Sequence, residues 1–263
     1  MNIFATDLDR SLIFSSKFIS FDMNPICVER NSEKEISYML EDSLKLLGDI
    51  KREQGLFLIP ITTRSVDQYK RIDCVQDSTY AITTNGGIIL HNGKKYDKWD
   101  NIVQSILMKY SRYFDDIPHI VQDFSYMFEK ELRCVDNIFY YIKLIDNQKD
   151  INKFLDYLEK TLDKNIWSFT LQGLKLYIIP KDITKENALK FLASELNCNK
   201  LITCGDGKLD KDFLSIGDIA YIPNGSEILE YIELTDKTVL VPNGLYGTAT
   251  LLKNVLKYHR KNS

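Results

Sequence analysis

The sequence predicts an α/β protein built on a doubly wound parallel sheet, with an α+β module inserted into it. In residues 1–85 and 176–263, short apolar runs suited to buried strands alternate with amphipathic stretches suited to helices. Residues 86–175 are instead rich in aromatic and charged residues. We therefore expect a Rossmann-like core domain from 1–85 and 176–263, and a second, inserted domain from 86–175.

The first part of the core is expected to alternate strand and helix. Ser32 and Glu35 have the spacing of a capping box, and we expect Gly55 to end the helix that they would begin. The expected elements are a strand over 3–6, this helix over 32–54, a strand over 56–61, a helix over 66–72 and a strand over 80–82, followed by a turn at 85–87.

The inserted module has the pattern of strands and helices that share one small core. Its expected elements are a hairpin of 88–90 and 94–99, a helix over 101–114, a strand over 137–144, a helix over 149–162 and a strand over 167–171. The core pattern then resumes with a strand over 175–179, a helix over 184–196, a strand over 201–204, a helix over 210–216, strands over 220–222 and 238–241, and a helix over 248–261.

Two carboxylates stand at the end of the first expected strand. Asp7 and Asp9, in the run Asp-Leu-Asp-Arg-Ser, follow the apolar residues 3–5. Open parallel sheets bind their ligands at the carboxyl ends of the strands, and aspartates are depleted inside strands. The pair therefore suggests a nucleophile and an acid/base beside a cation. The alternative interpretation is an Asx turn or a helix cap.

Three further segments supply the other parts of a phosphate and metal site. Thr62 and Thr63 follow the second apolar run, where hydroxyls and helix amides can seat a phosphate, or where a threonine simply caps the helix. Lys185 opens a helix, a position that disfavours a cation unless an anion lies in front of it. Asp206 follows Gly205 at another strand end, where it could complete a magnesium shell with Asp7.

These four segments, in this order, resemble the haloacid dehalogenase-like phosphohydrolases. That family has Asp-x-Asp-x-Thr/Ser, then a Thr/Ser after a strand, a lysine, and Gly-Asp-x-x-x-Asp. The position of the insert is similar to that of the type IIB cap found in Cof-like phosphatases and sucrose-phosphate phosphatase. The strings Asp-Leu-Asp-Arg-Ser and Thr-Thr-Arg also resemble a branch associated with tellurium-resistance-type stress operons.

The resemblance implies a role for each matching residue. Asp7 would be the nucleophile, and Asp9 would protonate the leaving oxygen and then activate water. Mg²⁺ would sit between the Asp7 carboxylate, the Asp9 backbone carbonyl, Asp206 and the substrate phosphate. The phosphate oxygens would be held by Thr62, with Thr63 beside it, and by Lys185, while Asp210 would support the metal shell or orient the lysine.

Two residues depart from the family pattern. Arg10 stands where the family often has glycine, and Leu209 replaces an asparagine that often precedes the second aspartate. Arg10 and Arg64 are the candidate substrate contacts, although a solvated surface explains them equally well. The resemblance implies a Mg²⁺-dependent phosphatase acting on a small phosphorylated metabolite, such as a sugar phosphate or a nucleotide. A phosphomutase and a noncatalytic ligand-binding or regulatory protein remain the alternatives.

Composition limits the partners. The chain has 263 residues, 44% of them hydrophobic, and a formal net charge of -3, so no global basic face is available for a nucleic acid polymer. No apolar run approaches the length of a membrane span, and charged residues interrupt the N-terminal run. We expect a cytoplasmic protein that binds no membrane, and the oligomeric state is left open.

Overall fold

The computed structural model describes all 263 residues, which divide into two compact units. Met1–Tyr96 and Lys185–Ser263 form the first unit, and Asp97–Thr184 forms the second. In the whole structure, no helix has both the length and the apolar character that crossing a membrane requires.

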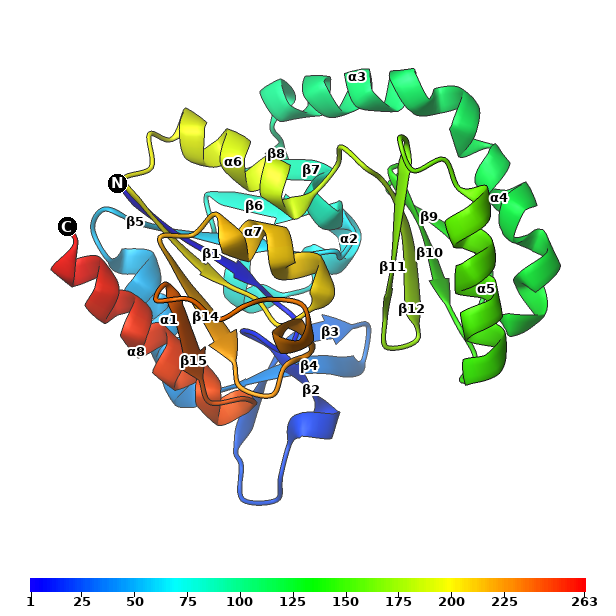
Figure 1. Cartoon of the computed structure of the whole chain (residues 1–263). Helices are drawn as coiled ribbons and strands as arrows, with labels where there is room; N and C mark the ends of the chain where they lie inside the picture. Colours follow the sequence, from blue (N-terminus) through cyan, green and yellow to red (C-terminus); the bar gives the residue numbers. More distant parts are fainter. The chain divides into compact units, whose positions relative to one another are not determined.

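An eight-stranded sheet forms the centre of the first unit (Figure 1). The strands run in the order β15-β14-β13-β1-β5-β6-β7-β8, parallel from β15 to β6 and antiparallel over the last two pairs. Their bounds are β1 (Asn2–Asp7), β5 (Leu56–Ile61), β6 (Tyr80–Thr83), β7 (Ile88–His91), β8 (Lys94–Lys95), β13 (Lys200–Cys204), β14 (Ile219–Pro223) and β15 (Thr238–Val241).

Helices cover both faces of this sheet. In Figure 1, α1 and α8 lie together on one face, whereas α6 and α7 lie together on the other. The helices of the unit are α1 (Glu41–Arg52), α2 (Val66–Tyr69), α6 (Lys185–Glu195), α7 (Lys211–Ser215) and α8 (Leu245–Lys261). The mainly parallel sheet with helices on both faces confirms the predicted fold class.

A small antiparallel sheet corrects one prediction. It consists of β2 (Phe14–Ser15), β4 (Lys34–Leu40) and β3 (Pro25–Asn31), in that order. The expected helix over 32–54 therefore begins only at α1. Ser32, the expected helix cap, adopts φ 54° in the two-residue turn between β3 and β4. Ser37 and Met39 are buried while their neighbours are not, which is the two-residue period of a strand.

The second unit has its own sheet and its own core. Four antiparallel strands run in the order β11 (Trp167–Gln172), β12 (Lys175–Pro180), β10 (Phe139–Lys143) and β9 (Arg133–Val135). Its helices are α3 (Asp97–Phe114), α4 (Asp116–Val121) and α5 (Gln148–Thr161). Stacked rings of Phe124 and Phe154, 4.6 Å apart, lie within a cluster of buried side chains. The unit is therefore an α+β module with a separate hydrophobic core.

Local pairing places the unit boundaries some ten residues later than the sequence analysis did. The strand expected at 88–90 is β7, which pairs with β6 because the turn after β6 folds the chain back on it. The short β8 pairs with β7, so both strands belong to the sheet of the first unit. The strand expected over 175–179 was placed in the core domain, but it belongs to the second unit. It forms a hairpin with β11 through a turn at Gly173, whose φ is 55°.

Candidate active site

The carboxyl ends of three neighbouring parallel strands carry the predicted site residues. Asp7 ends β1 opposite Ile61 of β5, and Thr6 lies opposite Cys204 of β13. Thr62 and the loop that begins at Gly205 therefore leave the sheet on either side of Asp7. The register of the parallel sheet alone brings these three segments of the chain to one edge.

Three buried aspartates form what we call the acidic cluster: Asp7, Asp206 and Asp210. A carboxylate oxygen of each lies within 4.8 Å of those of the other two, and none of the three residues is more than 6% exposed. Burial, with the negative charge of the neighbouring carboxylates, raises the pKa of Asp7 to about 7 and that of Asp206 to about 9. Hard oxygen donors held this close fit a divalent cation such as Mg²⁺, whose charge would compensate the repulsion.

Lys185 neutralises part of this negative charge. Its ammonium group donates to Asp7 Oδ1 at 2.7 Å and to Asp210 Oδ1 at 2.6 Å, and the side chain is only 3% exposed. Burial alone would lower the lysine pKa, but the charges of Asp210 and Asp7 hold it above its ordinary value. The two aspartates are thus the anions that explain a lysine at the first position of α6.

Asp210 stabilises the loop after β13. Its Oδ2 accepts hydrogen bonds from the backbone N–H groups of Asp206, at 3.0 Å, and Gly207, at 2.9 Å. A Cβ on Gly205 would lie 2.7 Å from the Asp210 Cβ, too close for any side chain. Glycine is therefore required there by close approach, and Asp210 both shapes the loop and contacts Lys185.

Asp9 lies in a different setting from Asp7. Its side chain is half exposed. Arg64 donates two hydrogen bonds to it, from Nε to Oδ2 at 2.8 Å and from Nη2 to Oδ1 at 2.7 Å. The third arginine nitrogen, Nη1, contacts the buried Glu29 at 2.7 Å. Arg64, considered above as a substrate contact, is thus occupied by two carboxylates of the protein itself. Glu29 was missed in the sequence, because its partner lies 35 residues away.

The structure excludes one of the two interpretations of the threonines, that of a helix cap. Ser65 caps α2, in a capping box with Gln68, so neither Thr62 nor Thr63 caps that helix. Thr62 is buried, and its Oγ1 accepts a hydrogen bond from the Arg64 N–H at 3.2 Å. The Thr62 hydroxyl proton is therefore still available for a ligand, and Thr63 beside it is half-buried.

Arg10 is exposed beside the acidic cluster. It adopts φ 61° in the turn after β1, and its guanidinium carbon lies 6.0 Å from the centre of the Phe18 ring. Its positive charge is a minor influence that lowers the pKa of Asp206, against the larger effects of burial and of Asp7. Arg10 therefore adds positive charge near the cluster without a carboxylate partner of the kind that holds Arg64.

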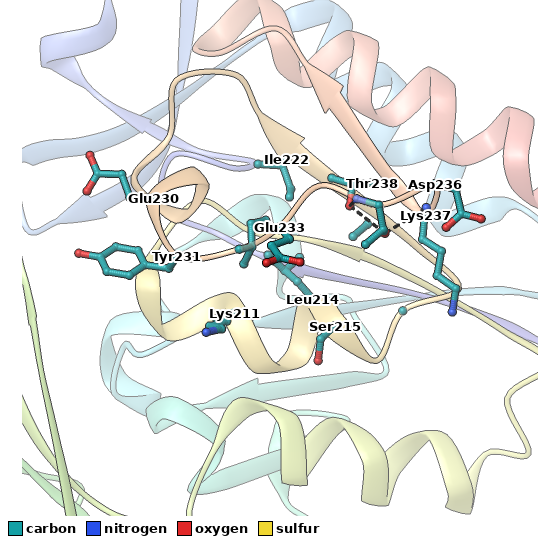
Figure 2. Close-up of a pocket in the computed structure, with 14 residues that line it drawn as sticks. Lys211, Leu214, Ser215, Ile222, Glu230, Tyr231, Glu233, Asp236, Lys237 and Thr238 are labelled. Carbon is teal, nitrogen blue, oxygen red and sulfur yellow. Dashed lines mark hydrogen bonds between the residues drawn. The ribbon is translucent and has the colours of Figure 1, made fainter.

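A groove in the first unit lies away from the acidic cluster. It has a volume of about 780 Å³ and is formed by α7, β14 and the segment 230–238, with Leu214 and Ile222 on its walls (Figure 2). No residue of the acidic cluster lines it. The parallel strands β14 and β15 are joined by a 3-10 turn at Glu227–Glu230 and an irregular segment, without an α-helix, beside this groove.

Fold and site together define a class: an α/β protein with a doubly wound sheet and an acidic site suited to a divalent cation. Comparison with protein families narrows this class. The sequence model of one family, described as haloacid dehalogenase-like hydrolase, matches residues 118–227, which include Lys185 and Asp206. Among curated protein sequences, none matches this chain.

Solved structures match nearly the whole chain at low sequence identity. The sucrose-phosphatase of Synechocystis sp. PCC6803, solved with sucrose and phosphate, is 14% identical, with 98% of each chain covered and a TM-score of 0.66. The C-terminal domain of C. albicans trehalose-6-phosphate phosphatase is 13% identical, with 97% of this chain and 93% of that one covered and a TM-score of 0.66. A haloacid dehalogenase-like hydrolase from B. subtilis is 16% identical, with 96% and 99% covered and a TM-score of 0.59.

At these identities the structural likeness establishes the fold, and the family model agrees with it. The chain is similar to the haloacid dehalogenase-like hydrolases over residues 118–227, and its fold is similar to that of the sucrose-phosphatase.

Proposed function

We propose that this protein is a Mg²⁺-dependent phosphatase that hydrolyses a small phosphorylated metabolite through an aspartyl-phosphate intermediate. The observation that carries the proposal is the pairing of Lys185 with Asp7 and Asp210 inside the acidic cluster. A buried carboxylate beside an ammonium group and a candidate cation site has what a nucleophile needs to approach a negatively charged phosphate.

In the first step, an oxygen of Asp7 attacks phosphorus while the bond from phosphorus to the leaving oxygen breaks. Asp9 donates its proton to that oxygen, so the product leaves as a neutral alcohol. In the second step, Asp9 accepts a proton from water, and the resulting hydroxide oxygen attacks phosphorus. The bond from Asp7 to phosphorus breaks, which releases inorganic phosphate and restores the Asp7 carboxylate.

The remaining residues bind and orient. Lys185 and the Thr62 hydroxyl would hold phosphate oxygens, with Thr63 beside them, and Asp210 would keep the lysine in place. Asp7, Asp206 and the Asp9 backbone carbonyl would hold Mg²⁺, which supplies positive charge against the phosphate when bound. Because the Mg²⁺ charge would relieve the repulsion between Asp7 and Asp206, both carboxylates would be ionised in the loaded site.

A sugar phosphate is the substrate class that we favour within this proposal. Two of the similar structures are named for sucrose phosphate and trehalose-6-phosphate. A nucleotide is the other small phosphate ester that the same chemistry would accept. Sugar phosphates and nucleotides are both small molecules. The chain has no net positive charge with which to bind a polyanion, so a small substrate suits it better.

The test is phosphate release from a panel of sugar phosphates, nucleotides and an aryl phosphate, with and without Mg²⁺. We expect Mg²⁺-dependent release by the wild type that Asp7→Asn abolishes. The matched control is Asp42→Asn, the same change at an exposed position on α1, which should leave the rate unchanged. Release by Asp7→Asn at the wild-type rate would exclude Asp7 as the nucleophile. Transfer of the phosphoryl group back to substrate, with no free phosphate, would instead indicate a mutase.

A further inference from the structure

Glu29 is a charged side chain that the proposed reaction does not use. It lies on β3 and is fully buried, with 0% of its surface exposed. Its Oε1 contacts Arg64 Nη1 at 2.7 Å, and its Oε2 accepts a hydrogen bond from Ser37 Oγ at 2.5 Å. Arg71 adds a second guanidinium at 3.6 Å. A carboxylate removed from water in this way is stable only because these partners fix it.

Arg64 connects Glu29 to Asp9. Two of its nitrogens hold both oxygens of Asp9, and the third holds Glu29. A guanidinium group is planar and rigid, so a two-point contact fixes the plane of the carboxylate as well as its distance. With its third nitrogen anchored on a buried group, Arg64 cannot rotate without breaking contacts on both sides.

The backbone of Arg64 is fixed as well. Its N–H donates to Thr62 Oγ1 at 3.2 Å, and its carbonyl accepts from the Thr84 N–H at 2.8 Å. Arg64 itself is only 13% exposed, whereas the Asp9 side chain is 52% exposed. The network therefore runs from a buried anchor through a buried arginine to a carboxylate that solvent and substrate can reach.

We propose that Glu29 is a positioning residue, which through Arg64 sets the orientation from which the Asp9 carboxyl delivers its proton to the leaving oxygen. The two contacts from Arg64 are those of the ionised carboxylate, the form that Asp9 takes once the proton has left. This inference rests on the proposed function. It makes the β3–β4 hairpin part of the reaction machinery, although the hairpin carries no residue that touches the reacting atoms in the proposed mechanism.

The inference predicts a dependence on the leaving group. An ester of an acidic phenol, such as 4-nitrophenyl phosphate, loses its leaving group with little help from an acid. Phenyl phosphate has a more basic leaving oxygen and needs the proton in the transition state. A displaced Asp9 should therefore slow the second ester far more than the first. A general loss of folded protein would slow both equally.

The test is kcat/KM of Glu29→Gln with Mg²⁺ on aryl phosphates that range from 4-nitrophenyl to phenyl phosphate. The ratio kcat/KM reports the steps up to phosphoryl transfer, so hydrolysis of the intermediate does not mask the effect. We expect a loss of about tenfold to a hundredfold on phenyl phosphate, which is part of the roughly hundredfold to ten-thousandfold that a general acid contributes, and a loss of no more than a few fold on 4-nitrophenyl phosphate.

A matched control exists on the same hairpin. Glu35→Gln makes the same change in an exposed ion pair with Arg30, and it should alter neither ester. Asp9→Asn gives the limiting case, with the steepest dependence on the leaving group. If Glu29→Gln does not fold, Arg64→Lys keeps the positive charge, loses the two-point contact and should show the same selective loss.

The outcomes separate the inference from the proposed function. An equal loss on every ester, in a wild type that is active, would overturn the inference and leave the phosphatase proposal standing. A wild type that releases no phosphate from any aryl or sugar phosphate with Mg²⁺ would overturn the proposed function, and the inference with it. A selective loss that Glu35→Gln does not share supports both.

Discussion

Lys185 stabilises two carboxylates that burial would otherwise disfavour. It lies within hydrogen-bond distance of both Asp7 and Asp210, and all three side chains are nearly inaccessible to water. Taking one partner out of a buried ion pair leaves a charge without compensation, which costs more than the pair itself contributes. The lysine is therefore expected to support the fold as well as the proposed phosphate site.

We predict that Lys185→Met lowers the free energy of unfolding by about 3–5 kcal/mol at neutral pH, the range found when a buried pair loses one member. Urea unfolding followed by circular dichroism measures it. The control is Lys190→Met, on the same helix, where the lysine is exposed and paired with Glu186. Similar losses for the two variants would show that burial of the Lys185 charge does not matter.

Among the elements, the β3–β4 hairpin was predicted least well. Ser32 and Glu35 have the spacing of a helix cap, and Ile36 and Leu40 fit a helical stripe, so the local signals favoured a helix. In the structure Ser37 and Met39 are buried with the two-residue period of a strand, which the sequence does not show as an apolar pattern because Ser37 is polar. Pairing between β3 and β4 decided the outcome, and such pairing is a tertiary effect that overrides helix propensity.

Three of the four segments of the site could be predicted because their arrangement follows from the parallel sheet. Once Asp7, Thr62 and Asp206 end or follow adjacent strands, the register brings them to one edge. The contacts of Glu29 and Arg64 could not be predicted, because they depend on how the hairpin packs against the loop after β5. No spacing in the sequence encodes that packing.

Two substitutions test whether residues 34–40 form a strand or a helix. Met39→Ala should cost about 2–5 kcal/mol, because Met39 is 1% exposed and truncation leaves a cavity. Leu40→Ala should cost less, since Leu40 is only half-buried. Chemical unfolding of both variants measures the order. The helical interpretation places Leu40 in the apolar stripe and Met39 outside it, so the reverse order would favour the helix.

For the whole molecule, the acidic cluster couples stability to pH and to metal. The pKa of Asp7 is raised from 3.8 to about 7 and that of Asp206 from 3.8 to about 9, chiefly by burial. The metal-free folded chain therefore holds more protons than the unfolded chain between about pH 4 and 9. The stability that Asp7 and Asp206 contribute is therefore present at low pH and is lost as the pH rises through that window.

A cation that replaces these protons should reverse the loss. We predict that Mg²⁺ raises the midpoint of thermal unfolding more at pH 8 than at pH 5.5, because protons compete with the metal for the same carboxylates at the lower pH. Thermal scans with and without Mg²⁺ measure the difference, and Asp206→Asn should remove it. An equal shift at both pH values would mean that Mg²⁺ binds elsewhere.

The second unit is one uninterrupted stretch, Asp97–Thr184, with a sheet and a core of its own, whereas every residue of the proposed reaction belongs to the first unit. The inserted unit is therefore bounded by only two points in the chain, between residues 96 and 97 and between residues 184 and 185. A gene that encodes this protein could exchange the insert for another at those two joints. Chimeras made at those joints would inherit the aspartates, the lysine and the Glu29–Arg64 contact unchanged. The chemistry and the inserted module can thus diverge as separate heritable parts.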